Sequence, residues 1–278
     1  MDSMGSTGSS TGSGDVTVPV KGGELWAHDS GDPGGTDGGA GLPLVLLHPG
    51  VGDSRIWDGI LPRLTERHRV IRYDARGYGR SPAPTAAFSL VEDLTAVLDH
   101  FGVARAVLAG SSMGGATAVS LALREPARAA GLVLVVPGIT GADDLVPVEF
   151  MAELGRLAEA GDMEGLVALL RRTSGAAVTG PDPEVEAHLR AVIPAWFANY
   201  PHNVPDPPAY DRLGELDVPC VLALGELDQA EVVRVNETMA RRIPGCRLVR
   251  LAHSDHFPTV REPDAVADLI LEALPGAR

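Results

Sequence analysis

The stretch AVLAGSSMGGATAVSLALR, residues 106–124, places a serine between an apolar run and a helical pattern. Residues 106–110 have the length and composition of a buried strand, whereas residues 116–124 have helical spacing. Between them, GSSMGG at residues 110–115 contains the pattern Gly-x-Ser-x-Gly with Ser112 at its centre. Small flanking residues are needed because neighbouring backbone lies close to a tight strand-to-helix turn. We therefore expect Ser112 at a helix N-terminus, where backbone N–H groups favour a developing negative charge.

Short apolar runs alternate with helical patterns through most of the chain, which is typical of a parallel sheet with helices on both faces. Two runs near the N-terminus, residues 16–20 and 24–28, are joined by Lys21-Gly22-Gly23 and predict a hairpin at the sheet edge. We therefore expect an α/β fold with an eight-stranded, mostly parallel sheet. The other six expected strands are residues 44–48, 70–74, 106–110, 132–136, 221–225 and 247–251.

Two helices can be placed from their apolar spacing and end signals. SLVE at residues 89–92 predicts a capping box that begins a helix, and Gly102 is expected to end it. The apolar face of this helix would comprise Leu90, Leu94, Val97 and Phe101. Residues 262–274 repeat the helical spacing and are expected to pack the last helix on the sheet.

The alternation of strands and helices breaks at residues 140–214, which contain helical segments and a proline-rich run but no expected strand. We interpret this stretch as a helical cap inserted between core segments at residues 15–139 and 215–278. The alternative is a pair of ordinary crossover helices with a long loop, although long structureless loops are uncommon. Residues 1–14 are rich in glycine, serine and threonine, and are expected to form a disordered tail.

Composition excludes several classes of function. Acidic side chains outnumber basic ones by 37 to 23, so a formal net charge of −14 disfavours nucleic acid and anionic membranes as partners. No apolar run approaches the roughly 20 residues of a membrane span, and the N-terminus lacks a signal-peptide pattern. The two cysteines, Cys220 and Cys246, lie in apolar runs. Buried, reduced thiols would suit a cytoplasmic protein.

A serine nucleophile needs a histidine base, and that base needs a carboxylate to orient it. LAHSDHFP at residues 251–258 follows the last expected strand and offers His253 and His256. GELD at residues 225–228 follows the preceding strand and ends on Asp228. The chain order serine, aspartate, histidine is the order expected of a nucleophile on a strand-to-helix elbow.

With these motifs, the chain resembles the α/β-hydrolase superfamily, especially its bacterial esterase, enol-lactonase and cofactor-free haloperoxidase branch. The resemblance extends from about Val16 onward. Its motifs are highly specific for the superfamily but only weakly specific for a substrate. It implies Ser112 as nucleophile, His256 as base and Asp228 as the residue that orients the base. The matching segments are residues 47–50 with Trp57, 73–81, 110–115, 225–228 and 256–258.

The resemblance also implies an oxyanion hole formed by the N–H of Met113 and by an N–H of the loop at residues 48–52. Counting back from Trp57 places the second donor at Gly50. Pro49 has no N–H and stands where the family usually has glycine, so Val51 is an alternative donor. We expect His48 to hold this loop through hydrogen bonds and not to act in catalysis.

Other assignments stay open at this point. His253 could replace His256, or the two could form a metal pair, although no third ligand cluster is apparent. Glu226 or Asp255 could orient the base in place of Asp228. An inactive descendant that only binds a ligand, or a receptor that cleaves it slowly, would keep the same residues. Dehalogenases and epoxide hydrolases are disfavoured because they carry aspartate at the position of Ser112.

We therefore expect a hydrolase that cleaves a small or medium carboxylic ester or lactone through an acyl-enzyme, without metal or organic cofactor. Perhydrolase, carbon–carbon bond hydrolase and amidase activities would use the same residues. The expected partner is a small-molecule substrate, and the sequence also allows a homo-oligomer. The cap should line the substrate pocket, with candidates Phe150, Met151, Met163, Trp196 and Phe197.

Overall fold

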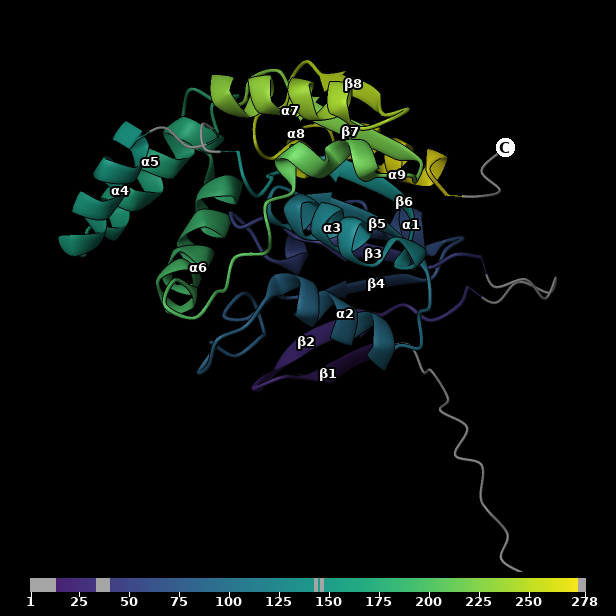
Figure 1. Ribbon diagram of the computed structural model, residues 1–278. Coiled ribbons are helices and arrows are strands. Elements are labelled where there is room, and N and C mark those ends of the chain that lie inside the picture. The colour runs from purple at the N-terminus through teal and green to yellow at the C-terminus, as the bar shows by residue number, and fades with distance from the viewer. Residues whose placement is uncertain (1–13, 34–40, 143–144, 146–147, 275–278) are drawn as a thin grey trace, which may run out of the picture.

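An eight-stranded sheet forms the centre of the molecule (Figure 1), as predicted. The computed structural model describes residues 14–33, 41–142, 145 and 148–274. The strand order is β1-β2-β4-β3-β5-β6-β7-β8; β2 pairs antiparallel with β1 and β4, and the other pairings are parallel. The strands are β1 (Gly14–Val20), β2 (Gly23–Asp29), β3 (Leu44–Leu47), β4 (Val70–Tyr73), β5 (Ala106–Ser111), β6 (Ala129–Val135), β7 (Cys220–Gly225) and β8 (Arg247–Leu251).

The predicted N-terminal hairpin is confirmed. β1 and β2 are connected by Lys21 and Gly22, and Gly22 has φ +74°, a conformation that glycine adopts without a steric penalty. The tail expected at residues 1–14 lies outside the described residues, except that Gly14 already begins β1. No helix within the described ranges is long and apolar enough to cross a membrane.

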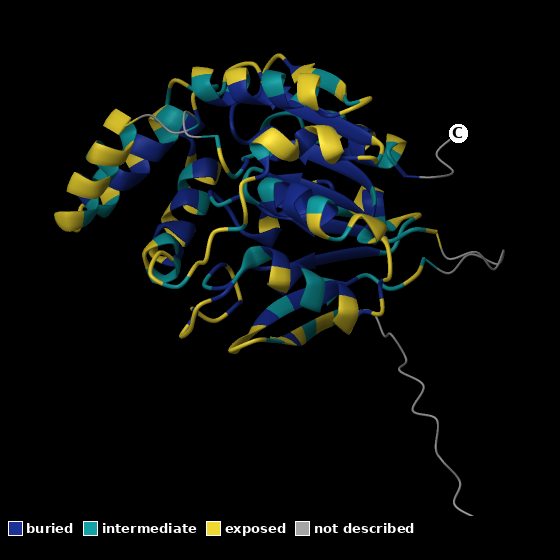
Figure 2. Ribbon diagram, viewed as in Figure 1, coloured by how far each residue is buried: buried dark blue, intermediate teal, exposed yellow. Residues whose placement is uncertain are grey.

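Helices cover both faces of the sheet, and alternate strand residues supply the two cores (Figure 2). Because neighbouring side chains on a strand point to opposite faces, Val45 packs on one side and Leu46 on the other. The first face is covered by α2 (Leu90–His100), α3 (Met113–Arg124) and α7 (Ala230–Arg242). The second is covered by η1 (Ser54–Trp57), α1 (Leu61–Thr65), α8 (Pro258–Arg261) and α9 (Pro263–Glu272).

Between β6 and β7, ahead of a short 3-10 helix, lie the α-helices α4 (Val148–Glu159), α5 (Met163–Ser174) and α6 (Pro183–Asn199). They pack against one another and stand together at one end of the sheet (Figure 1). The described part of this insertion contains no strand, as the sequence pattern predicted. Two short helices, η2 (Pro126–Arg128) and η3 (Tyr210–Glu215), complete the elements.

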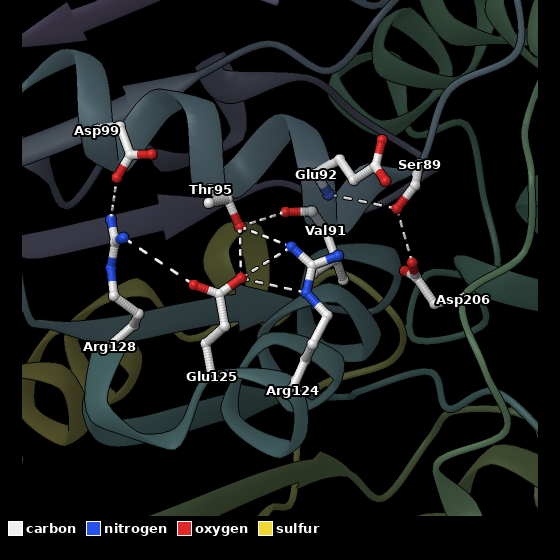
Figure 3. A network of polar contacts seen from close by, with 9 residues as sticks. All are labelled: Ser89, Val91, Glu92, Thr95, Asp99, Arg124, Glu125, Arg128 and Asp206. Atoms are coloured by element: carbon white, nitrogen blue, oxygen red, sulfur yellow. Dashed lines mark hydrogen bonds and ion pairs between the residues drawn. The ribbon is translucent and has the colours of Figure 1, made fainter. Parts of the chain in front are cut away.

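The segment that returns from α6 to β7 is fastened to the start of α2 (Figure 3). Ser89 accepts a hydrogen bond from the Glu92 N–H at 3.3 Å, which confirms the serine half of the predicted capping box. The same hydroxyl donates to the Asp206 carboxylate at 2.8 Å. Gly102 follows the helix with φ +64°, as expected for its stop signal.

Candidate functional site

Ser112 lies on a strained turn between β5 and α3, as the sequence pattern predicted. Its φ of +48° and ψ of −111° are unusual for a residue with a side chain, and α3 begins at the next residue. The flanking glycines are sterically required. A Cβ on Gly110 would lie 2.4 Å from the Gly114 carbonyl oxygen, and one on Gly114 would lie 2.3 Å from the Leu47 carbonyl oxygen. The turn therefore presents Ser112 at the helix N-terminus because small residues let β3, β5 and α3 approach closely.

The structure brings Ser112, His256 and Asp228 into one line of hydrogen bonds. His256 Nε2 lies 2.9 Å from Ser112 Oγ, and His256 Nδ1 lies 2.6 Å from Asp228 Oδ2. The Asp228 side chain is fully buried and also accepts the Gln229 N–H at 2.7 Å through Oδ1. Because Nδ1 faces a carboxylate, its proton is held there and Nε2 is left as the acceptor toward the serine hydroxyl.

The other candidates for base and carboxylate lie elsewhere. His253 is exposed, and its backbone N–H donates to Glu262. Glu226 is exposed and pairs with Arg250 at 3.5 Å. Asp255 is fully buried, but its carboxylate binds Arg261 and does not contact the imidazole. None of these three side chains lies beside His256 Nδ1, the position that Asp228 occupies.

His48 and Trp196 hold the loop at residues 48–52 from two sides. His48 Nε2 accepts the Ala75 N–H at 3.0 Å, so its proton is on Nδ1, which donates to the Pro49 carbonyl at 2.8 Å. The expected structural role of His48 is thus confirmed. Trp196 of α6 donates from Nε1 to the Gly50 carbonyl at 2.6 Å. A Cβ on Gly50 would be 3.9 Å from Met113 Cβ, so this loop and the start of α3 are neighbours.

A cavity of about 190 Å³ opens beside Ser112 and His256. Phe150 and Trp196 line it, as predicted, whereas Met151 and Phe197 are exposed and Met163 packs against the core. Ser112, His256 and Val51, which the sequence analysis placed at the site, also line it. The other lining residues were not identified from the sequence, because no local pattern distinguishes a pocket residue from a core or loop residue. The full lining is Val51, Ser112, Pro137, Gly138, Leu145, Phe150, Leu170, Ser174, Trp196, Gln229, Val232 and His256.

A model of the alpha/beta hydrolase family matches residues 44–269. The chain belongs to this family. Its fold and its Gly-x-Ser-x-Gly turn agree with that membership, as the resemblance in the sequence implied.

Relatives of this α/β-hydrolase include esterases and a lactonase. A pimeloyl-[acyl-carrier protein] methyl ester esterase of Legionella pneumophila is 26% identical over 239 residues, which cover 81% of this chain and 92% of the relative. A putative carbamate hydrolase, RutD, of Caulobacter vibrioides is 28% identical over 268 residues, 86% of this chain and 92% of the relative. The crystal structure of the enol-lactonase from Burkholderia xenovorans LB400 has a TM-score of 0.75 at 25% identity, covering 92% of this chain and 98% of that one. The α/β-hydrolase described here is accordingly a hydrolytic enzyme.

Electrostatics favour the protonated form of His256 in this hydrolase. Burial by itself would lower the pKa of the imidazole, but the negative charge of Asp228 and its hydrogen bond raise it, and the charge of Asp255 adds to the rise. The net effect is a pKa above the usual histidine value. The His256 imidazole therefore becomes neutral only at a pH higher than for an ordinary histidine.

The described residues of the hydrolase contain no group of three or more His, Cys, Asp or Glu side chains arranged to hold a metal ion. The metal pair considered for His253 and His256 has no third ligand among them. Cys220, the first residue of β7, and Cys246, which immediately precedes β8, are free thiols with Sγ atoms 3.7 Å apart.

Proposed function

We propose that this α/β-hydrolase is a serine hydrolase that cleaves a small, neutral carboxylic ester or lactone through an acyl-enzyme. The observation that carries the proposal is the pair of hydrogen bonds that joins Ser112 to His256 at 2.9 Å and His256 to Asp228 at 2.6 Å. This geometry meets the requirement that nucleophile, base and orienting carboxylate lie within hydrogen-bond reach of one another.

In the first half of the reaction, Ser112 Oγ attacks the substrate carbonyl while His256 Nε2 takes the hydroxyl proton. His256 then donates that proton to the leaving oxygen, which departs as an alcohol or remains attached to the opened lactone. In the second half, His256 removes a proton from the water that attacks the acyl group. It then returns this proton to Ser112 Oγ as the acyl–serine bond breaks and the acid is released. Asp228 stays ionised, keeps the proton of His256 on Nδ1 and stabilises the imidazolium in both halves.

The oxyanion would form at the N-terminus of α3. The Met113 N–H belongs to the first residue of this helix, where the orphan donors and the positive end of the helix dipole favour negative charge. The loop at residues 48–52 would supply the second donor, from Gly50 as the family pattern implies or from Val51. Val51 is supported by its place in the cavity wall, and Gly50 by its closeness to Met113.

The cavity favours neutral, mainly apolar acyl groups. Besides Ser112 and His256, the polar side chains among its described lining residues are Ser174 and Gln229, and none of the others carries a charge. A substrate carboxylate entering this space would lose water without gaining an ionic partner, which is costly. The esterase and enol-lactonase relatives support an ester or lactone as the substrate class.

Residues 140–214 would serve as a cap over this site, with residues 15–139 and 215–278 forming the core. Leu145, Phe150, Leu170, Ser174 and Trp196, all from the proposed cap, line the cavity. The unbonded thiols of Cys220 and Cys246 suit a reducing compartment, so we propose the cytoplasm as its location.

The substrate proposal is tested with matched esters of one leaving group. We expect 4-nitrophenyl butyrate to be hydrolysed with a kcat/KM at least on the order of 100-fold above that of 4-nitrophenyl hemisuccinate, because the latter buries an unpaired carboxylate. A panel of neutral lactones should be assayed in parallel. Equal turnover of the two esters would contradict the neutral-substrate assignment, and absence of turnover with every ester and lactone would contradict hydrolysis of this class.

A further inference from the structure

A buried group of three charged side chains lies directly behind the His256 loop. Arg261, at the end of α8, donates from Nε and Nη2 to Asp255 Oδ2, both at 3.0 Å. Its Nη2 also donates to Asp182 Oδ2 at 2.6 Å. The side chains are 11% exposed for Arg261, 8% for Asp182 and 0% for Asp255. One guanidinium therefore joins two carboxylates that are almost removed from water.

The two carboxylates belong to different parts of the molecule. Asp182 is the N-cap of α6, where its Oδ1 accepts the Val185 N–H at 3.3 Å, so it lies in the insertion between β6 and β7. Asp255 immediately precedes His256 in the loop after β8. Arg261 thus joins the helical insertion to the loop that carries the histidine.

Asp255 also fixes the backbone around His256. Its Oδ1 accepts the Phe257 N–H at 2.9 Å, and its Oδ2 accepts the Ala177 N–H at 3.0 Å. The His256 N–H itself donates to the Ser174 carbonyl at the end of α5, at 3.0 Å. The insertion therefore holds the His256 backbone through Ser174 and the Asp255 side chain through Ala177, and Asp255 in turn holds the Phe257 N–H. Arg261 neutralises the Asp255 carboxylate that makes two of these contacts.

The cluster by itself adds little to the free energy of unfolding, because the cost of desolvating buried charges offsets most of their attraction. A packed apolar group could fill the same space. We propose that Arg261 is a positioning residue, which through Asp255 and Asp182 fixes the His256 loop against the cap so that Nε2 stays directed at Ser112. This inference rests on the proposed function, in which His256 is the base.

Removing the charge of Arg261 should shift the pKa of His256, whereas a residue that only packs against the loop would have no such effect. Among the described residues, the carboxylates whose charge acts on His256 are Asp228, in direct contact, and Asp255, which is paired with Arg261. Asp182 lies beyond the guanidinium. Loss of the Arg261 charge would leave Asp255 uncompensated and raise the pKa of His256 further, so the base would become neutral only at higher pH.

The experiment measures kcat and kcat/KM against pH for wild type, Arg261→Gln, Arg261→Lys and Asp182→Asn. Arg261→Gln should lower kcat by about 10- to 100-fold, the scale expected when a catalytic group is slightly misplaced. It should also move the acid limb of kcat/KM to higher pH. Arg261→Lys should return the acid limb of kcat/KM to its wild-type pH but should recover kcat only in part. An ammonium keeps the positive charge but lacks the planar guanidinium that binds both carboxylates. Arg190→Gln is the matched control, since Arg190 forms an exposed pair with Glu164 on the same insertion.

A folded Arg261→Gln protein with the wild-type kcat and acid limb would overturn the proposal, and so would equal effects from Arg190→Gln. If Arg261→Gln does not fold, Asp182→Asn tests the proposal instead. This variant removes one carboxylate of the cluster but keeps an N-cap for α6, because asparagine also caps helices well. It should lower kcat with the circular dichroism spectrum kept, and an unchanged kcat would overturn the proposal. Fluorophosphonate labelling of wild type and Ser112→Ala is run alongside. Labelling of Ser112→Ala would overturn the proposed function itself, whatever the Arg261 variants do.

Discussion

Asp228 controls both the tautomer and the charge of His256, so its replacement should have two separate effects. Asp228→Asn keeps the shape of the side chain, but its single amide oxygen would accept the Gln229 N–H and its NH2 would face Nδ1. The favoured tautomer of His256 would be lost, and turnover should fall on the order of 10,000-fold. The wild-type pKa of His256 is raised chiefly by Asp228 against the effect of burial. Activity should therefore rise through a pH above the usual histidine value in wild type, and the residual activity of the variant should rise at lower pH.

The measurement is kcat/KM across the pH range in which histidine titrates. Asp211→Asn, at an exposed carboxylate on η3, is the control and should leave the profile unchanged. An acid limb that stays in place in Asp228→Asn would show that this carboxylate does not set the pKa of the base.

Trp196 is expected to hold the loop at residues 48–52, the proposed source of the second oxyanion donor, through one hydrogen bond. Trp196→Phe keeps an aromatic ring in the cavity wall but removes the 2.6 Å bond to the Gly50 carbonyl. A hydrogen bond of this kind contributes roughly 0.5–1.5 kcal/mol, so kcat/KM should fall by about 2- to 10-fold. Trp26→Phe, on β2, is the matched control. Equal kcat/KM for Trp196→Phe and wild type would show that this hydrogen bond does not hold the loop in its active position.

At the scale of elements, the crossing of β3, β5 and α3 depends on glycine. Gly114→Ala would place a Cβ 2.3 Å from the Leu47 carbonyl oxygen, and should cost about 1–3 kcal/mol of unfolding free energy through overpacking. Gly155→Ala in α4 has nothing within 4 Å of its Cβ and should be neutral or stabilising by up to about 1 kcal/mol. Urea unfolding of both variants checks this contrast, and similar midpoints would contradict it.

The elements were predictable to the extent that local pattern determines them. The eight strands, the Lys21-Gly22 hairpin and the Ser89 cap follow from apolar periodicity and turn chemistry, which act over a few residues. The strand order and the packing of α4, α5 and α6 depend on contacts between distant segments, and no local pattern encodes these. For the same reason, Phe150 and Trp196 were identified as pocket residues together with Met151, Met163 and Phe197, which are not.

At the scale of the whole molecule, the site joins Ser112 to His256, which lies 144 residues later in the sequence. Ser112, Asp228 and His256 could be predicted because each sits in a motif at a strand end. Arg261 could not be distinguished from the other arginines of the chain, because its role arises only when α8 meets the insertion. The hydrogen bond from Trp196 to Gly50 likewise joins α6 to a loop 146 residues away in sequence.

The whole reaction should proceed with side chains and water alone. Dialysis of the purified enzyme against EDTA is expected to leave kcat unchanged, since the proposed steps use Ser112, His256 and Asp228 only. Activity that is lost on dialysis and recovered with a divalent cation would require a different mechanism.

Covalent labelling shows whether Ser112 is the nucleophile. Wild-type protein treated with a fluorophosphonate should gain the mass of one phosphonyl group, mapped by peptide mass spectrometry to Ser112, and should lose all esterase turnover. Ser112→Ala should gain no mass and show no turnover. Label on another residue of the wild type, or full labelling of Ser112→Ala, would contradict the assignment.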